Sequence, residues 1–360
     1  MKILFITHGD THYKNVNAMS GIADELEILG FEKYKEEIVK SINNPPKDNI
    51  KISYEKSLIR FILKPRKIKA DLVIAHCPIS GLSAVLSKKP FVFLMCQDFY
   101  EYYELFPRPF LEKKIKLFLI DFMTKLACKK AKKVICLSTY IEKKAKEYGA
   151  KKTHIIPLFG VDMALVSPKN NNPNLKKELG IKNQKVLVTN ARLSPEKGLQ
   201  YLIRAVKILE KENIILLIIG RSWEDEEKRL KDLVKRLGLE NKIKFLGTFP
   251  FKEIPHFYNI SDVCLLVSLK EGLGFTAAEP LACLKPIIGS NTGGIPDIVI
   301  HNKTGLLVEP GNSQQIADAI ILLLKDKKLR DKLVKQGYNH IKEKFEEKKV
   351  VDAFREAILK

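Results

Sequence analysis

Hydrophobic residues along the chain gather in short continuous runs, and segments with helical periodicity separate most of these runs. Strands are predicted at residues 2–7, 50–54, 71–76, 91–96, 134–137 and 154–157, and again at 185–189, 214–219, 243–246, 263–269, 286–288 and 305–308. Continuous rather than alternating apolar residues are typical of strands buried on both faces of a parallel sheet. The pattern therefore predicts an α/β protein built from βαβ units.

Helices are predicted between the strands, where apolar residues recur every three to four positions. They cover residues 22–29, 32–42, 109–133, 199–210, 226–237, 252–258, 277–284, 313–324, 331–344 and 347–359. A polar, turn-forming stretch at 167–174 interrupts the series, and the alternation of strands and helices then restarts. We therefore expect two domains of similar size, joined by this linker and facing a central cleft. Ligands of such sheets bind beyond the carboxyl ends of the strands.

The composition fits this organisation and adds a strong positive charge. The chain has 360 residues, enough for two domains, and a formal net charge of +21. Such an excess favours anionic partners, but it is also common in lysine-rich proteomes. Basic patches interleaved with aromatic residues, and the motifs of nucleic-acid-binding proteins, are missing from the sequence, so no nucleic-acid partner is expected.

The lengths of the apolar runs and the positions of the cysteines indicate where in the cell the protein is expected. No apolar run approaches the ~20 residues of a membrane span, and the N-terminal run is too short for a signal peptide. The six cysteines form no Cys-x-x-Cys pair, and most lie inside apolar runs, as expected for thiols of a hydrophobic core under reducing conditions. The expectation is a cytoplasmic protein, with peripheral binding to the inner membrane face left open.

The predicted helix at 109–133 combines apolar residues with many lysines. One broad face carries Leu111, Ile115, Phe118, Leu119, Phe122, Met123 and Leu126, and lysines between Lys113 and Lys133 crowd the rest. The helix could dock on anionic lipid headgroups. It could equally pack its apolar face on the sheet and leave the lysines in solvent.

A glycine turn lies between a predicted strand and a predicted helix at 271–279, with the sequence Glu-Gly-Leu-Gly-Phe-Thr-Ala-Ala-Glu. A strand that runs through such a turn into a helix makes an anion site. The flanking carboxylates of Glu271 and Glu279 suit hydroxyl groups better than phosphates, which suggests a sugar nucleotide. Alternatively, Glu279 could close a capping box with Thr276.

The same turn also matches the dinucleotide fingerprint as Gly272-x-Gly274-x-x-Ala277. That fingerprint requires an acidic residue about 20 positions on, at the end of the next strand. Here the sequence Ser-Asn-Thr-Gly-Gly stands at 290–294 instead, so a dehydrogenase is disfavoured. Gly293 and Gly294 suggest either close approach of a ligand to the backbone or a tight turn.

Two cations, Arg192 and Lys197, lie in the loop after the first strand of the second half. A guanidinium fork and an ammonium five residues apart can converge on one diphosphate, although solvent exposure is the usual fate of both residue types. The sequence contains no Asp-x-Asp pair and no His/Cys cluster with metal-ligand spacing. A diphosphate would therefore be neutralised by these cations and by backbone dipoles rather than by a metal ion.

Taken together, the spaced motifs of the second half resemble glycosyltransferase family 4, the retaining sugar-nucleotide transferases of GT-B fold (group 1 glycosyl transferases). The resemblance rests on Arg-Leu-Ser-Pro-Glu-Lys-Gly at 192–198, the turn at 271–279, Gly-Gly-Ile-Pro-Asp-Ile-Val at 293–299 and Thr-Gly-Leu-Leu-Val at 304–308. It is strong from about 186 to 324 and weaker before, where Gly-Val-Asp at 160–162 is also similar.

The resemblance implies a division of labour between two Rossmann-like domains. An N-terminal domain, residues 1–167 with about 345–360, would bind the acceptor, and residues 168–344 would bind the donor. The C-terminal helix would cross back to the first domain. Arg192 and Lys197 would bind the donor diphosphate, Glu271 the donor sugar and Glu279 the ribose. Further residues that would line the donor are Gly274, Phe275, Thr276, Gly293 and Gly294.

Two departures from the family concern the acceptor side. The family usually has Gly-Gly after the first strand, where this chain has Ser20-Gly21, and a His-Asp pair where it has Gln97-Asp98. Gln97 can form hydrogen bonds but cannot titrate. His8 and His76 follow other strand ends, where a structural role is the commoner one.

The sequence thus predicts a metal-independent, retaining transferase that uses a UDP-, GDP- or ADP-sugar and needs no cofactor. The acceptor is left open among a glycan, a small molecule and a lipid-linked molecule. A GT-B sugar-nucleotide epimerase and a non-catalytic subunit that binds sugar nucleotides are the alternatives.

Overall fold

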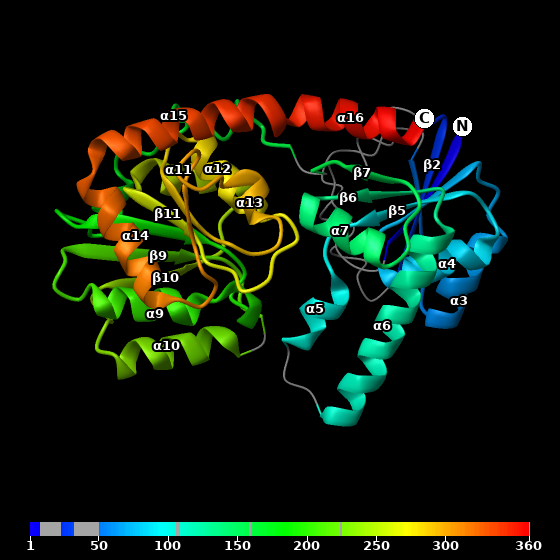
Figure 1. The fold of residues 1–360 in the computed structure, drawn as a ribbon, viewed down its shortest axis with the longest axis horizontal. Coiled ribbons are helices and arrows are strands. Elements are labelled where there is room, and N and C mark those ends of the chain that lie inside the picture. The colour runs from blue at the N-terminus through cyan, green and yellow to red at the C-terminus, as the bar shows by residue number, and fades with distance from the viewer. Residues whose placement is uncertain (8–22, 32–49, 106–108, 158–159, 224, 360) are drawn as a thin grey trace. The chain divides into compact units, whose positions relative to one another are not determined.

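The computed structural model describes residues 1–7, 23–31, 50–105, 109–157, 160–223 and 225–359. The chain divides into two compact units (Figure 1): unit 1 is Met1–Gly160 with Lys348–Lys360, and unit 2 is Val161–Glu347. The sequence placed the division at 167/168. Val161 belongs to unit 2 because its N–H donates to the carbonyl of Phe345 at 2.7 Å and its carbonyl accepts from the N–H of Glu347 at 3.0 Å.

Unit 1 contains a parallel sheet with the strand order β3-β2-β1-β4-β5-β6-β7. Its strands are β1 (Lys2–Thr7), β2 (Glu25–Phe31), β3 (Ile50–Glu55), β4 (Leu72–Ala75), β5 (Phe91–Met95), β6 (Lys133–Cys136) and β7 (Thr153–Ile155). Strands β4, β5 and β6 are buried along their whole length, as their continuous apolar runs predict.

Strand β2 corrects a sequence prediction, because residues 22–29 were expected to be helical. Instead, β2 pairs with β1 and β3, one on each side. Leu26, Ile28 and Leu29 are buried, and so is Glu27 between two of them. A short apolar run cannot be assigned by periodicity alone, and pairing within the sheet decided here. The helix predicted at 32–42 lies outside the described residues.

The helices of unit 1 cover the faces of this sheet. They are α3 (Leu58–Leu63), η2 (Lys64–Arg66), α4 (Pro78–Ser87), α5 (Phe99–Glu104), α6 (Phe110–Lys130), α7 (Thr139–Glu147) and α16 (Glu347–Leu359). Phe61 of α3, Ala84 of α4, Ala127 of α6 and Ile141 of α7 are buried in one hydrophobic cluster with the strands. These four helices therefore share a common core.

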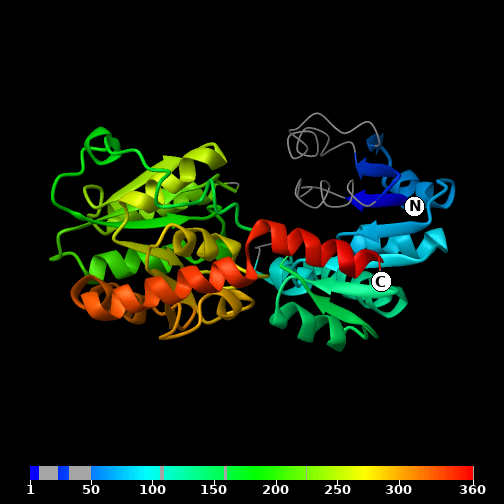
Figure 2. The same cartoon turned by 90° about the horizontal axis from the view of Figure 1, so that it is seen from above.

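Helix α16 confirms the expectation that the C-terminal helix returns to the first domain (Figures 1 and 2). Its residues Val350, Phe354 and Ala357 are buried. The buried ammonium of Lys133, at the start of β6, donates a hydrogen bond to the carbonyl of Ala357. A cation suits this end of the helix because the last carbonyls of a helix carry partial negative charge.

Unit 2 is built on a second parallel sheet, with the order β10-β9-β8-β11-β12-β13. Its strands are β8 (Lys185–Asn190), β9 (Ile214–Ile219), β10 (Ile243–Gly247), β11 (Val263–Leu266), β12 (Ile287–Ser290) and β13 (Leu306–Val308). The chain runs outward from β8 to β10 and then restarts at β11 on the other side of β8. The β8/β11 boundary is thus a topological switch point, where open α/β sheets bind ligands.

Helices surround the second sheet. They are α8 (Leu175–Glu178), η3 (Pro195–Lys197), α9 (Leu199–Ile208), α10 (Glu226–Arg236), η4 (Phe251–Glu253), α11 (Ile254–Ile260), η5 (Phe275–Ala277), α12 (Ala278–Ala282), α13 (Ile295–Ile298), α14 (Ser313–Lys325) and α15 (Lys327–Lys344). Leu202, Leu230 and Ile320, from α9, α10 and α14, pack in one cluster with Leu216 of β9.

All six cysteines are free thiols, and all except the partly exposed Cys96 are buried, as expected for core residues. Among the described residues, no helix is both long enough and apolar enough to cross a bilayer.

Candidate functional site

The predicted donor residues lie in three loops at the carboxyl edge of the sheet in unit 2. Strand β8 ends at Asn190, β11 at Leu266 and β12 at Ser290. Strand β11 pairs with both β8 and β12, and all three strands are parallel. The loops that follow these strands therefore emerge side by side at the switch point.

Lys197 and Glu271, separated by 74 residues in the chain, meet at this edge. The Lys197 Nζ lies 2.6 Å from Glu271 Oε2. The side chains are 14% and 15% exposed, so the pair is largely shielded from water. Ser268 Oγ donates to the same carboxylate oxygen at 3.1 Å. The sequence predicted both residues for the site, but it did not predict that they contact each other.

Arg192 lies above a buried acidic residue. One of its guanidinium nitrogens lies 3.3 Å from Glu196 Oε1, which also accepts from Ser194 Oγ at 2.7 Å. The Arg192 side chain is 44% exposed, whereas that of Glu196 is 2% exposed. Trp223 stacks near the guanidinium, with 5.8 Å from Cζ to the ring centre. Arg192 is therefore oriented at its base, while its head reaches solvent, where it can meet an anion.

Gly293 brings the third loop against the second. Its φ is +55°, and an added Cβ would lie 1.7 Å from the carbonyl oxygen of Glu271. The N–H of Gly294 donates to that same carbonyl at 3.3 Å. The glycine pair therefore serves close packing between two backbone loops, and that packing fixes the position of Glu271. Close approach of a ligand is not needed to explain it.

Gly274 starts the short helical segment that the sequence assigned to the donor. Its φ is +78°, and a Cβ there would lie 2.7 Å from Ile295 Cγ1. Phe275 and Thr276 follow in the three-residue helix η5, and α12 has only five residues. The helix predicted at 277–284 is thus shorter in the structure, where it spans only Ala278–Ala282. Because helix dipoles add over aligned peptides, this segment attracts an anion less than a long helix would.

Glu279 is buried and belongs to a hydrogen-bonded chain. The Tyr258 hydroxyl, from α11, donates to Glu279 Oε2 at 2.5 Å, and Asn190 Nδ2 donates to the Tyr258 hydroxyl at 3.1 Å. Burial, and then the neighbouring Glu279 carboxylate, raise the pKa of Tyr258 well above its usual value. Tyr258 therefore keeps its proton and acts as a hydrogen-bond donor to the carboxylate.

This arrangement corrects the capping-box interpretation. Thr276 lies inside η5, and the residue that precedes α12 is Ala277, which has no capping side chain. Glu279 is the second residue of α12, a helix without a side-chain cap. Thr276 and Glu279 therefore do not form a capping box, although their spacing matches one. The carboxylate of Glu279 is oriented by Tyr258.

Asp98, predicted on the acceptor side of unit 1, is a buried structural carboxylate. It caps α5 by accepting from the N–H groups of Tyr100 and Glu101, and the Tyr148 hydroxyl donates to it at 3.0 Å. Burial raises the pKa of Asp98. Its neighbour Gln97 is partly exposed at the carboxyl end of β5. Any effect of Asp98 on an acceptor would therefore act through the position of α5.

The other residues considered for the acceptor side are less informative. Gly21 and His8 lie outside the described residues. His76 lies just before Cys77, the N-cap of α4, and its ring contacts Phe5 edge-on with 6.5 Å between ring centres. Its backbone N–H donates to Ser80 Oγ at 2.9 Å, which fits a residue that forms part of the helix entry.

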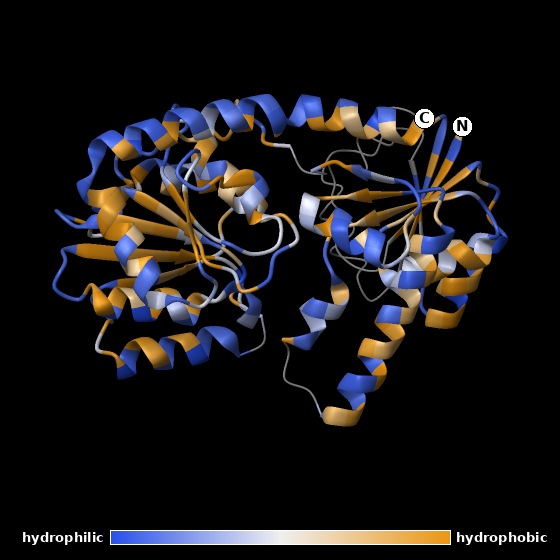
Figure 3. Ribbon diagram, in the orientation of Figure 1, coloured by the Kyte–Doolittle hydropathy of each residue, from blue (hydrophilic) through white to orange (hydrophobic). Residues whose placement is uncertain are grey.

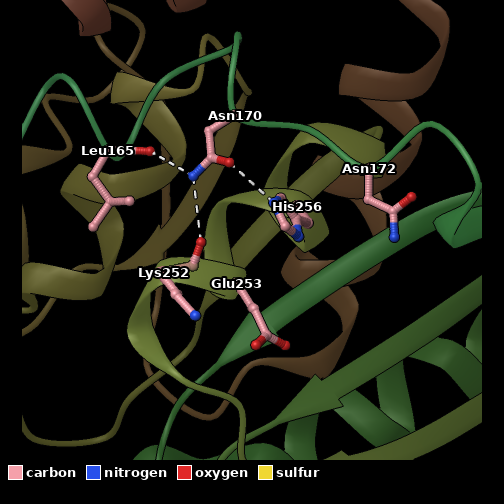
Figure 4. Close-up of a pocket in the computed structure, with 6 residues that line it drawn as sticks. All are labelled: Leu165, Asn170, Asn172, Lys252, Glu253 and His256. Atoms are coloured by element: carbon pink, nitrogen blue, oxygen red, sulfur yellow. Dashed lines mark hydrogen bonds between the residues drawn. The ribbon is translucent and has the colours of Figure 1, made fainter.

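A pocket of about 590 Å³ opens elsewhere in unit 2 (Figure 4). Its lining residues are Leu165, Asn170, Asn172, Lys252, Glu253 and His256. Asn170 donates to the carbonyls of Leu165 and Lys252 and lies 3.0 Å from His256 Nε2. These contacts attach the polar stretch 167–174 to η4 and α11. That stretch, predicted to be a linker, is thus part of the second unit.

Sequence reasoning missed several residues of the site. The missed residues form hydrogen bonds that orient the predicted ones, either directly or through a neighbour. They are Tyr258, Asn190, Ser268 and Glu196. The signal for Tyr258 was a tyrosine next to Phe257 in a predicted helix, because a tyrosine hydroxyl that is buried usually needs a hydrogen-bond partner. Ser268 and Asn190 stand directly at or after strand ends and could have been found on that ground.

Known proteins match the half of the chain that contains the predicted donor residues. Residues 171–340 match the family model "Glycosyl transferases group 1". N-acetyl-alpha-D-glucosaminyl L-malate synthase of Bacillus anthracis is 33% identical over 188 residues, which are 52% of this chain and 48% of that protein. D-inositol 3-phosphate glycosyltransferase of Corynebacterium glutamicum is 32% identical over 190 residues, 50% of this chain and 46% of that protein. The chain thus matches about half the length of these curated relatives.

Solved structures extend the likeness to the whole chain at the level of fold. Sucrose-phosphate synthase of Thermosynechococcus elongatus has a TM-score of 0.81 at 18% identity, covering 99% of this chain and 98% of that one. HepE of Anabaena, solved with UDP-glucose, has a TM-score of 0.80 at 21% identity, covering 99% of both. Residues 171–340, which lie in the second unit, are thus similar to the group 1 glycosyl transferases, and the two parallel-sheet units have the GT-B fold.

Proposed function

We propose that this chain transfers a sugar from a nucleotide-diphosphate sugar to an acceptor, with retention of the anomeric configuration and without a metal ion. The observation that carries the proposal is the contact between Lys197 and Glu271 at the switch point, with Arg192 in the same loop as Lys197. A cation that holds a carboxylate on one side can hold a phosphate on the other. The pair thus suits a ligand with both hydroxyls and phosphates.

The donor would lie along the three loops. Arg192 and Lys197 would neutralise the diphosphate, and the carboxylate of Glu271 would accept hydrogen bonds from the sugar hydroxyls. Glu279 would accept from the ribose hydroxyls while Tyr258 holds one of its oxygens. The backbone at Gly274, Phe275 and the Gly293–Gly294 turn would pack against the sugar and phosphates. HepE, which shares the fold, was solved with UDP-glucose and gives a precedent for such a donor.

In the transfer step, the bond between the sugar C1 and the diphosphate oxygen breaks, and the acceptor oxygen bonds to C1 on the same face. The proton of the acceptor hydroxyl moves to an oxygen of the leaving diphosphate, which balances the charge. Arg192 and Lys197 stabilise the negative charge that develops on this leaving group. Because two cations serve this role, the reaction should proceed in EDTA.

The acceptor would bind to unit 1, near Gln97 at the carboxyl end of β5. A lipid-linked acceptor is favoured by the lysine-rich segment 113–133, which suits an anionic membrane surface. A cytoplasmic location with peripheral membrane contact fits this proposal and the free thiols of the core. A sugar-nucleotide epimerase, or a subunit that binds the donor without transfer, is the competing function.

A donor panel separates these functions. The protein is incubated in EDTA with UDP-, GDP- and ADP-sugars, with and without lipid, glycan and small-molecule acceptors, and nucleotide release is followed. We expect release with one donor class, accelerated by an acceptor, and an NMR spectrum showing the anomeric configuration of the donor in the product. An inverted product, or absolute dependence on added metal, would refute the mechanism. Isomerised donor without transfer would point to the epimerase.

A further inference from the structure

Helix α6 carries two apolar faces, and only one of them is buried. The residues buried against unit 1 are Ile120, Thr124, Ala127 and Cys128. A second stripe, here called the α6 ridge, consists of Leu111, Ile115, Phe118, Leu119 and Phe122. At 3.6 residues per turn the two stripes lie roughly on opposite sides of the helix. The broad apolar face predicted from the sequence is therefore mostly the outer face, and packing on the sheet does not account for it.

The α6 ridge is exposed along its length. Exposure is 69% for Leu111, 54% for Ile115, 68% for Phe118, 47% for Leu119 and 53% for Phe122. Figure 3 shows hydrophobic and hydrophilic bands alternating along this helix. Exposed apolar residues are normally scattered singly over a monomer, so a continuous stripe of five large side chains indicates a surface that is covered in use.

Helix α3 also exposes apolar residues. Leu58, Ile59 and Leu63 are 43%, 71% and 42% exposed. Both α3 and α6 pack against α4, so they belong to one helical layer on the sheet of unit 1 (Figure 1). Apolar residues are thus exposed on two helices that both pack against α4.

Lysines border the α6 ridge on both sides. By helical position, Lys114 and Lys125 flank one edge of the ridge and Lys116 and Lys130 the other. All four are exposed, and Lys125 also pairs with Asp121, with 2.8 Å from Nζ to Oδ2. The Lys114 ammonium lies 4.4 Å from the centre of the Phe110 ring at the start of the helix. Lysine stems can lie along apolar surface while their ammonium groups reach outward to anions.

We propose that unit 1 binds to an anionic lipid bilayer by inserting the α6 ridge between the headgroups, with the flanking lysines contacting lipid phosphates. Apolar side chains enclosed by cations match the interface of an anionic membrane, which is apolar below and negative above. A second copy of this chain is a poorer partner, because it would present the same lysines and the same net charge of +21. The inference deepens the membrane contact included in the proposed function, but vesicle binding tests it without any donor or transfer step.

Vesicle flotation tests this inference with the full chain. Vesicles of phosphatidylcholine alone and of phosphatidylcholine with about one third phosphatidylglycerol are compared at low and high salt. We expect the wild-type protein to float with the anionic vesicles only, and less well at high salt. Phe118→Glu/Phe122→Glu should lose at least ten-fold in binding, and Lys114→Gln/Lys125→Gln should lose several-fold.

Ile208→Glu is the matched control, because Ile208 is 46% exposed at the end of α9 in unit 2 and lies outside the ridge. It should float like the wild type. The ridge positions are exposed, so their variants should keep the wild-type melting temperature. Failure of the wild type to bind anionic vesicles would overturn the proposal, as would equal binding by the Phe118/Phe122 variant. A dimer in light scattering that this variant abolishes would identify a second copy as the partner and would also overturn it.

Discussion

The two units of this chain have the same architecture, yet their functional features are of different kinds. In unit 2, three loops at one sheet edge bring Lys197 to 2.6 Å from Glu271 and place Gly293 against the Glu271 carbonyl. In unit 1, the acidic residue predicted for the acceptor side, Asp98, is buried as a helix cap, and the prominent feature is the exposed α6 ridge. Unit 2 is thus organised around a site and unit 1 around a surface.

The proposed function gives this difference a physical cause. A diphosphate and two sugar rings have fixed chemistry, so cations, carboxylates and glycines must stand at fixed positions. A membrane or a variable acceptor places weaker demands on sequence, because apolar area and positive charge can be supplied in many ways. Substitutions in unit 2 should therefore act on donor chemistry, and those in unit 1 on association or on stability.

The largest effect is expected from the pair at the switch point. Lys197→Ala and Glu271→Ala should each lower the rate of transfer by about 10²–10³-fold, the usual result of removing one group that stabilises developing charge or orients the sugar. Initial rates with the best donor measure this. Lys211→Ala and Glu212→Ala, exposed in the turn before β9, are the controls. Comparable rates in a pair variant and its control would remove the distinction between the units.

Gly293→Ala should destabilise unit 2 and lower activity. An alanine at this positive φ costs about 1–2 kcal/mol in backbone strain. Its Cβ would also lie 1.7 Å from the carbonyl oxygen of Glu271, so the loop would have to move. Gly238→Ala is a matched control, since its φ is +67° and no atom lies within 4 Å of the added Cβ. Thermal denaturation should show a clearly larger loss for Gly293→Ala. Equal losses would mean that loop packing does not hold Glu271 in place.

Tyr258→Phe should raise the KM for the donor about ten-fold with little change in kcat. The variant removes one hydrogen bond to the carboxylate of Glu279 and leaves the ring in the core. Steady-state kinetics separates the two parameters, and Tyr338→Phe on α15 serves as the control. A fall in kcat at unchanged KM would show that Tyr258 acts on the reacting groups instead of on ribose binding.

The smallest effect concerns Asp98 and depends on pH. Burial raises the pKa of its carboxyl group in the folded state. The stability from this group is therefore full below the unfolded pKa of about 3.9 and is lost as the pH rises through the folded value. Asp98→Asn imitates the protonated form, so its melting temperature should match the wild type near pH 4 and exceed it slightly at pH 7.

Asp318→Asn, on the exposed side of α14, should show no such trend. A large loss of transfer in Asp98→Asn at unchanged stability would place Asp98 at the acceptor and weaken the contrast between the units.

Much of the fold could be predicted from the sequence, because continuous apolar runs such as 214–219 leave few alternatives to a buried parallel strand. Strand β2 was missed since its run is short and its strand character comes from pairing with β1 and β3. The motif residues of the donor side could be placed at one sheet edge, but Tyr258 could not, because contacts across 21 residues are set by packing. For α6 the sequence left open whether the apolar face packs on the sheet or docks on lipid, because periodicity alone does not show what covers a face.

The most direct test of the donor site is a calorimetric titration of UDP, GDP and ADP into the full chain in EDTA. The account predicts that at least one nucleoside diphosphate binds, and that Lys197→Ala weakens this binding at least ten-fold while Lys211→Ala leaves it unchanged. Wild-type protein that binds none of the three, or a Lys197→Ala variant that binds as tightly as the wild type, would contradict it.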